Sequence, residues 1–167
     1  MKIEGHLWEV EKMQPKDPLL DVMKRTMYNL SYIENQANNE GPFEVTQLIN
    51  SFLGALAHPW EKYRGELKEV SLEKAQAKGC PVVDKDEQED ADPTNLGDLL
   101  RRMRNGIAHG NIRFNPDDKG DIETVSIWNY EHGTCKREWG ATISVNIMRT
   151  FLFKFVELAE QLHGKQR

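Results

Sequence analysis

Apolar side chains recur at helical spacing through most of this sequence, and that pattern predicts a mainly helical protein. The first such stripe begins behind Pro18 and continues to about Asn38, and Asp17 precedes it as a possible N-terminal cap. Its apolar members are Leu19, Leu20, Val22, Met23, Met27, Leu30 and Ile33. Residues 1–17 are polar and contain a proline, so we expect an extended N-terminal arm ahead of this helix.

The second predicted helix begins at Pro42 and is apolar on nearly all of its sides, which is typical of a central helix. His58-Pro59 should end it, because a proline disfavours helical geometry in the residue before it. A more polar helix is expected to follow from Trp60 to about Lys78. His58 could be a ligand, but a histidine at a helix end is more often an exposed or hydrogen-bonded side chain.

A third apolar stripe predicts a helix from Leu96 to His109. Thr94 or Asn95 can cap its start, and Gly110 or Asn111 can end it in left-handed backbone geometry. Its core-facing members recur at intervals of four, three and four residues, as one face of a helix requires: Leu96, Leu100, Met103 and Ile107.

The period of the pattern then changes to two residues, which predicts short strands. Turn-forming sequences separate three such segments: Ile112 to Phe114, Glu123 to Tyr130 and Cys135 to Ile143. Ser144 or Asn146 can cap a last, strongly apolar helix. No repeat and no linker divides the chain. The predicted fold class is therefore mainly α: one domain over residues 1–167, with a small antiparallel hairpin or meander inserted before the last helix.

Composition and termini place this domain in a general class. The 167 residues are 38% hydrophobic and 29% charged, which is ordinary for a single globular domain. Cys80 and Cys135 are distant in sequence and lack zinc-ligand spacing, so we expect unpaired thiols in a reducing compartment. The N-terminus lacks the apolar run of a signal peptide, and no segment approaches the ~18 apolar residues of a membrane span. These features favour a cytosolic protein without a membrane partner.

The net charge of −5 would argue against a nucleic-acid partner if it were evenly distributed. Residues 84–92, however, contain six acids and one lysine and account for all of it. They lie in a predicted loop over 79–93, which we expect to be a solvated, mobile acidic segment; the alternative is that it covers a basic surface as a phosphate mimic. Four arginines with no acid between them form a local basic patch that could attract a phosphate: Arg101, Arg102, Arg104 and Arg113.

The helix that ends at His109 carries side chains suited to chemistry on a phosphodiester. On a helical wheel Arg102, Asn105 and His109 share one face. Arg104 and His109 lie about 140° apart, so a second copy of the helix would close a groove between them better than one copy. Arginine binds phosphate, histidine moves a proton and asparagine can orient either one. Together they suit cleavage of RNA by its own 2′-hydroxyl, without a metal or another cofactor.

The spacing alone does not decide for catalysis, because a histidine at a helix C-terminus is often a capping or buried residue. Gly106 adds a second sign. A glycine inside a helix costs about 0.5–1 kcal/mol relative to alanine, so some neighbour should approach the helix closely there. That neighbour is either another element of the same chain or a second subunit, and Ala108 and Gly110 extend the strip of small residues.

The segment from Leu99 to Asn111 resembles the signature helix of the HEPN superfamily: an arginine, usually followed by a polar residue, then a histidine after four to six intervening positions. Arg104, Asn105 and His109 match this signature residue by residue, with four positions between arginine and histidine. Residues 42–54, 127–129 and 139–155 are similar to a stand-alone bacterial HEPN branch carried on plasmids and chromosomes. The resemblance covers about residues 18–160.

The resemblance implies an up-and-down helical bundle, a homodimer whose motif helices line one cleft, and in many members a metal-independent endoribonuclease. Arg104 is then expected to bind and stabilise the phosphorane, His109 to act as acid or base, and Asn105 to position them. Arg101 and Arg102 should add contacts to RNA phosphates. Such a protein could be a toxin or defence effector with an unidentified antitoxin partner. The alternative is a non-catalytic nucleotide- or RNA-binding regulatory module.

Overall fold

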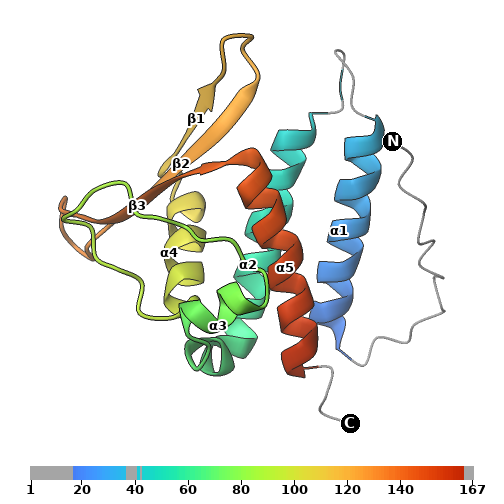
Figure 1. The fold of residues 1–167 in the computed structure, drawn as a ribbon, viewed down its shortest axis with the longest axis horizontal. Helices are drawn as coiled ribbons and strands as arrows, with labels where there is room; N and C mark the ends of the chain where they lie inside the picture. The colour runs from blue at the N-terminus through green and yellow to red at the C-terminus, as the bar shows by residue number, and fades with distance from the viewer. Residues whose placement is uncertain (1–16, 37–40, 42, 164–167) are drawn as a thin grey trace.

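The computed structural model describes residues 17–36, 41 and 43–163, apart from the side chains of residues 57–61 and 163. The predicted arm over residues 1–17 lies outside the described residues except for Asp17, as do Pro42 and the expected end of the first helix at residues 37–38. The described chain is mainly helical with one small sheet before the last helix, as predicted (Figure 1). Its helices are α1 (Pro18–Gln36), α2 (Glu44–Lys68), α3 (Leu72–Ala77), α4 (Leu96–Ala108) and α5 (Val145–His163), and its strands are β1 (Ile112–Pro116), β2 (Ile122–Tyr130) and β3 (Arg137–Ser144).

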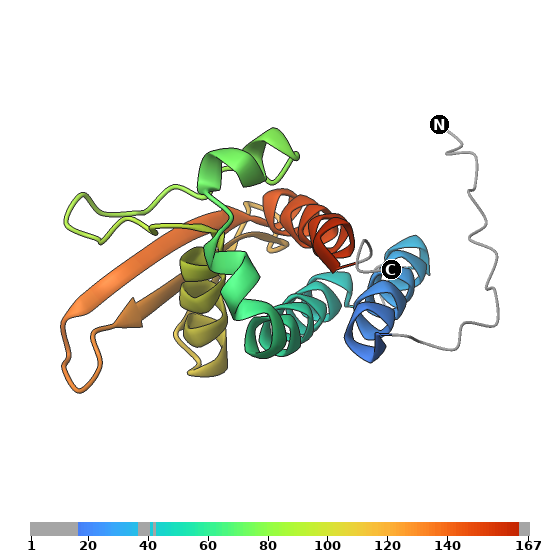
Figure 2. The ribbon, with the colours of Figure 1, turned by 90° about the horizontal axis from the view of Figure 1, so that it is seen from below.

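The helices pack as a bundle beside the sheet. Helices α1, α2 and α5 lie side by side, and α4 lies between α2 and the sheet (Figures 1 and 2). Helix α2 packs against α1, α4 and α5, so the prediction of a central helix is confirmed. The rings of Phe52 in α2 and Phe151 in α5 meet with their centroids 5.9 Å apart. Burial of these apolar faces, at about 25 cal/mol per Å², is the main force that holds the bundle together.

Polar side chains begin α1, α4 and α5, largely as predicted. The Asp17 carboxylate accepts a hydrogen bond from the backbone N–H of Leu19 at 3.0 Å at the start of α1. Of the two alternatives at each later helix, Asn95 caps α4 and Ser144 caps α5. Each of their side-chain oxygens accepts from the backbone N–H three residues later, at 2.9 and 3.2 Å respectively. Capping of this kind stabilises a helix end by about 1 kcal/mol.

The predicted helix end at His58-Pro59 is wrong, because α2 continues through the proline to Lys68. Its irregular residue is Tyr63, with φ −113° and ψ 15°. A proline inside a helix costs about 3 kcal/mol. Leu56 and Leu67, on either side of the proline, are both almost fully buried in the core, and their burial offsets that cost. The side chain of His58 lies outside the described atoms.

The boundary between the second and third helices does not lie at residues 58–59, as predicted, but between Lys68 and Leu72. The helix predicted over residues 60–78 is therefore divided between two helices. Its first part belongs to α2, and its last part forms the short helix α3. Ser71 separates them by capping α3: its hydroxyl accepts a hydrogen bond from the backbone N–H of Lys74 at 3.2 Å. A serine in this position competes with helix continuation, because its side chain satisfies the backbone donors of a new helix.

The sheet is antiparallel in the order β1-β2-β3, and its side chains alternate between the helices and solvent. The three predicted strands are confirmed, although β3 begins at Arg137 rather than Cys135. Apart from Gly140, which is buried under the acidic segment, the buried residues of β2 and β3 occur at every second position of their strand and face the helices: Val125, Ile127, Asn129, Trp139, Ala141 and Ile143. The period of two read from the sequence therefore identifies the covered face of the sheet.

The acidic segment lies against β3. It contains neither helix nor strand, as predicted, but the backbone N–H groups of Asp86 and Ala91 each donate to a β3 carbonyl, Gly140 and Glu138 respectively, at 2.9 Å. Asp90 is only 4% exposed, and its carboxylate accepts from the backbone N–H of Gly140 at 3.0 Å. The expectation of a solvated segment is therefore wrong at these positions. The reason is that β3 is an edge strand, and the loop satisfies its outer backbone groups.

The acids of this segment bind a different arginine from those of the basic patch. Arg137 of β3 forms a bidentate contact with Asp90 and ion pairs with Asp86 and Glu87. Gly140 permits this arrangement, since a Cβ at that position would lie 2.1 Å from the Arg137 guanidinium. The alternative, that the segment covers the arginines of α4 as a phosphate mimic, does not match these pairings.

Two further expectations concern cysteines and membranes. Neither Cys80 nor Cys135 forms a disulfide, as predicted. Cys80 is buried, and its burial raises the pKa of the thiol to about 11, whereas Cys135 is exposed. None of the helices in the described part of the chain is both long enough and apolar enough to span a bilayer.

Candidate functional site

The motif helix α4 ends in a left-handed glycine that fixes the position of His109. Gly110 has φ +71°, and the backbone N–H groups of Gly110 and Asn111 donate to the carbonyls of Ile107 and Gly106 at 3.1 and 2.9 Å. This pair of hydrogen bonds is a Schellman motif, which terminates a helix abruptly. The imidazole of His109 is therefore exposed at a defined helix end.

Helix α4 approaches the sheet closely at Gly106. A Cβ at this position would lie 2.4 Å from Cγ2 of Ile127 and 2.9 Å from the backbone oxygen of Trp128. The sequence left open whether the close neighbour of Gly106 is an element of the same chain or a second subunit. The structure shows that it is β2 of the same chain. The backbone N–H of Trp128 also donates to the carbonyl of Asn111 at 3.2 Å, so the end of α4 and β2 form one unit.

A cleft of about 730 Å³ lies between α4 and the turn that joins β2 to β3. Two residues of the predicted motif, Asn105 and His109, line it. The remaining lining residues come from α4, its C-terminal loop, the acidic segment and the β2–β3 hairpin: Ala91, Arg101, Asn111, Asn129, Tyr130, Glu131, His132, Gly133, Thr134 and Glu138. The fold thus brings the end of the motif helix and a distant hairpin to one hollow surface.

Arg104 lies beside this cleft and is not one of its lining residues. Its Nη1 donates a hydrogen bond to Oδ1 of Asn105 at 2.9 Å. Because this bond occupies the amide oxygen, it sets the orientation in which Asn105 presents its NH₂ group. The structure therefore brings Asn105 and His109 together in one cleft, and it connects Arg104 to that cleft through Asn105.

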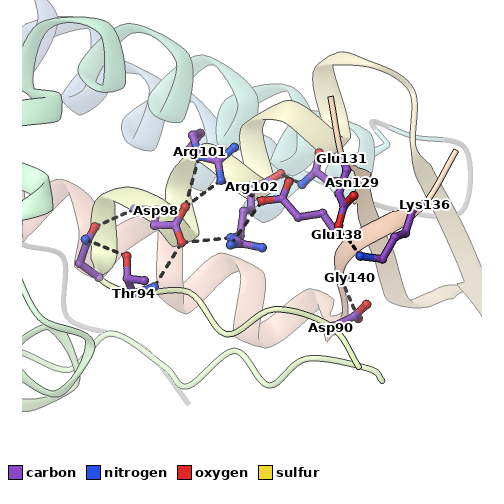
Figure 3. A network of polar contacts seen from close by, with 11 residues as sticks. Asp90, Thr94, Asp98, Arg101, Arg102, Asn129, Glu131, Lys136, Glu138 and Gly140 are labelled. Carbon is purple, nitrogen blue, oxygen red and sulfur yellow. Dashed lines mark hydrogen bonds and ion pairs between the residues drawn. The ribbon is translucent and has the colours of Figure 1, made fainter. Parts of the chain in front are cut away.

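Arg101 and Arg102 are held by two carboxylates (Figure 3). Asp98, one turn earlier on α4, pairs with Arg101 at 2.8 Å and with Arg102 at 3.1 Å. Glu138 on β3 pairs with the same two arginines at 3.2 and 3.4 Å. Although burial alone would raise the pKa of Asp98, hydrogen bonds from Arg101 and from the backbone N–H of Thr94 hold it below its ordinary value.

The two arginines differ in how accessible they are. The side chain of Arg102 is 7% exposed, so the expectation that it contacts RNA phosphates does not fit its position. The side chain of Arg101 is 34% exposed and lines the cleft, so it remains accessible to an anion. The helical wheel, which grouped Arg102 with Asn105 and His109, overlooked β3, which covers Arg102 and supplies Glu138.

The sequence-based description of a basic patch was therefore incomplete. Asp98 lies three and four residues before Arg101 and Arg102, so that pairing was visible as helical spacing. Glu138 follows the arginines by more than thirty residues, and no local pattern connects it to them. The arginine charge near the cleft is partly compensated by these two acids.

The hairpin residues of the cleft were missed by sequence reasoning. Tyr130, Glu131 and His132 were assigned only to the end of a strand and a turn, and no motif distinguished them. Asn129, at the register shift beside Tyr130, is buried and donates its amide N–H to the backbone carbonyl of Arg102. This bond fastens the hairpin to α4 and so positions the opposite wall of the cleft (Figure 3).

The arrangement combines a cation, an amide and imidazoles on one surface. Such groups can bind the oxygens of a phosphodiester and transfer protons.

The HEPN pEK499 p136 family model matches residues 9–166. No curated protein and no solved structure matches the chain. Because the family match spans nearly all of the sequence and includes the whole motif helix, the chain belongs to the HEPN pEK499 p136 family within the HEPN superfamily.

Proposed function

We propose that this protein is a metal-independent endoribonuclease, which cleaves RNA by attack of the RNA's own 2′-hydroxyl. The observation that carries the proposal is the cleft that Asn105 and His109 line together, with Arg104 bonded to Asn105. The HEPN family match supports it, because nuclease and nucleotide-binding modules occur in this superfamily. The hairpin supplies the other lining residues, and a volume of about 730 Å³ is in the range of small-molecule binding sites.

The proposed roles follow from the chemistry of each group. His109 transfers a proton, because imidazole is the side chain that changes charge between about pH 5 and 8. Asn105 positions the substrate through its amide donor, and Arg104 stabilises the charge that develops on the phosphorane oxygens. Arg101 adds a contact to an RNA phosphate. Arg102, which is buried between two acids, supports the cleft wall instead of touching RNA.

We further propose a homodimer formed through α4. Arg104 is half-buried and lies beside its own cleft, on the same side of α4 as Ala108, which is exposed. A second α4 packed there would place Arg104 of each subunit next to the cleft of the other. Gly106 takes no part in this contact, since it is buried against β2 of its own chain. A role as a toxin or defence effector, restrained by an antitoxin, is the biological setting we propose by resemblance to the superfamily.

The proposal is tested by measuring RNA cleavage in excess chelator with purified full-length protein. Wild type should release products that end in 2′,3′-cyclic phosphate and 5′-hydroxyl. His109→Ala should lower the rate by about 10²–10⁴-fold, because it removes a proton-transfer group. Arg104→Ala should lower it by about 10²–10³-fold, because it removes stabilisation of the phosphorane charge. Arg25→Ala, which removes an exposed arginine of α1, serves as the matched control and should retain the wild-type rate.

Two results would contradict the proposal in different ways. If the wild-type protein binds RNA or nucleotides but leaves them intact, it is the non-catalytic binding module and not a ribonuclease. A protein that cleaves only with added divalent metal uses a different mechanism. Thermal melting of each variant is the control for folding. Both side chains lie off the apolar stripe of α4, so their truncation should leave the melting temperature nearly unchanged.

A further inference from the structure

Two histidines from separate elements line the same cleft. His109 ends α4, and His132 lies in the turn between β2 and β3. Both side chains are exposed, and the cleft between the walls has a volume of about 730 Å³. A single chain therefore presents two imidazoles to any molecule bound there.

The turn that carries His132 is internally ordered by hydrogen bonds. The backbone N–H of Thr134 donates to the carbonyl of Glu131 at 3.0 Å, and the backbone N–H of Glu131 donates to the carbonyl of Lys136 at 2.9 Å. Gly133, with φ +75°, supplies the left-handed residue that closes the turn. Since Asn129 ties the same hairpin to α4, both histidines belong to one connected structure.

Cleavage of RNA by its 2′-hydroxyl requires two proton transfers at opposite ends of one displacement. The proton must leave the attacking O2′, and another must reach the departing O5′. We propose that His132 is the second proton-transfer group of this cleft, so that His109 and His132 of one chain serve as its base–acid pair. This inference rests on the proposed ribonuclease function.

The step is balanced without a further reactant. One imidazole takes the proton from O2′, the O2′–P bond forms, and the P–O5′ bond breaks. The other imidazole, in its protonated form, gives its proton to O5′. The products are a 2′,3′-cyclic phosphate and a 5′-hydroxyl, and Arg101 and the Asn105 amide can donate to the non-bridging phosphate oxygens from α4.

The charged neighbours of His132 are largely paired with one another. From the turn, Glu131 pairs with Lys136 at 2.6 Å. From β3 and α4, Glu138 pairs with Arg101 at 3.2 Å. Tyr130 completes the ionisable groups on this wall, and its hydroxyl accepts a hydrogen bond from Nε1 of Trp128 at 3.1 Å. Among the residues that line the cleft, the two histidines are therefore the side chains best suited to general acid–base catalysis.

The test compares two substrates with full-length wild type, His109→Ala and His132→Ala. On an RNA oligonucleotide each variant should be about 10²-fold slower or worse. On uridine 3′-(4-nitrophenyl phosphate), whose leaving group departs without a proton, the variant that lacks the acid should recover to within about tenfold of wild type. The variant that lacks the base should stay slow. The wild-type rate on RNA should follow a bell-shaped pH profile, and each variant should lose one limb of it.

Cys135→Ser is the matched control. Cys135 is exposed in the same turn and is not among the residues that line the cleft, so this variant should keep the wild-type rate. An active wild type whose His132→Ala variant cuts RNA at full rate would overturn the inference alone. So would a His132→Ala variant equally impaired on both substrates that keeps both limbs of the pH profile, because His132 would then act only in binding. A wild type that cleaves neither substrate would overturn the proposed function, and this inference with it.

Discussion

At the scale of single residues, Gly106 shows how a position without a side chain can determine a packing contact. The sequence indicated that something approaches the helix there, and the structure identifies Ile127 and Trp128 of β2 as the neighbours. The contact with Trp128 is made by its backbone oxygen, which cannot move away as a flexible side chain would.

We therefore expect Gly106→Ala to destabilise the protein. The added Cβ would lie 2.4 Å from a buried isoleucine methyl group, and overpacking of this kind costs about 1–3 kcal/mol. Gly65→Ala in α2 is the matched control, since a Cβ there meets no atom within 4 Å. It should instead stabilise by about 0.5–1 kcal/mol through helix propensity. Urea unfolding of both variants measures the difference, and an equal stabilisation of both would show that α4 is not held tightly against β2.

A second residue-scale prediction concerns Asp17 and acid stability. Burial alone would raise the pKa of this carboxyl, but hydrogen bonds from Tyr63, Lys62 and the first backbone N–H groups of α1 lower it to about 2. A folded-state pKa below the unfolded value contributes stability above about pH 4, and this contribution is lost as the pH falls towards 2. Asp17→Asn should cost on the order of 1–2 kcal/mol at pH 7 and flatten the loss of stability between pH 4 and 2.

Chemical unfolding between pH 7 and 2 measures this contribution of Asp17. Asp118→Asn, in the exposed β1–β2 turn, serves as the control and should leave both the stability at pH 7 and the acid profile close to wild type. If Asp17→Asn has the acid profile of wild type, the contact between the start of α1 and Tyr63 does not stabilise the fold.

At the scale of elements, the acidic segment is best understood as the cover of an edge strand. Its high charge density made it look like a solvated loop, because local composition does not reveal what lies beside it. In the fold, Asp90 binds both the backbone of Gly140 and the guanidinium of Arg137, so one carboxylate serves a strand and an arginine together.

Asp90→Asn should therefore lower the free energy of unfolding by about 1–3 kcal/mol, the range for loss of a buried, charged hydrogen-bond partner. Glu89→Gln is the matched control: it removes the same charge from an exposed neighbour and should change stability by less than about 0.5 kcal/mol. Thermal melting with hydrogen exchange at β3 would test this. If the two variants are equally stable, the contacts of Asp90 do not stabilise the fold, and the segment behaves as the solvated loop that its composition indicated.

At the scale of the whole molecule, the proposed function depends on how Arg104 would reach a phosphate of bound RNA. It lies beside the cleft of its own chain and contacts Asn105, which lines it. In the proposed dimer, a two-fold axis at α4 would use the same surface of both subunits, so one substitution there would act on both sites.

Mixing two inactive variants distinguishes a shared site from a self-contained one. In a mixed dimer of Arg104→Ala and His109→Ala subunits, one cleft would combine an intact His109 with Arg104 of the partner subunit. Activity should then return to about a quarter of wild type after subunit exchange, because half of the dimers are mixed and each has one intact site. Sedimentation should show a dimer at micromolar concentration. An active monomer, or a mixture with no restored activity, would contradict the shared site.

Much of this molecule could be predicted from local sequence. Apolar periodicity identified α1, α4, α5 and the covered face of the sheet, and the caps Asn95 and Ser144 were among the alternatives named. These features depend on residues within about four positions of one another, or on the alternation of a strand. The motif residues Arg104, Asn105 and His109 were found for the same reason, since they occupy one short helix.

The tertiary structure decided the features that depend on distant contacts. Core burial on both sides of Pro59 carried α2 through a residue that locally favours a break. Glu138 of β3 pairs with the arginines of α4. The acidic segment binds the outer edge of β3 through backbone hydrogen bonds. The β2–β3 turn placed His132 in the same cleft as His109, which is more than twenty residues away in the chain. Such partners are set by how the helices and sheet pack, and no spacing along the chain encodes them.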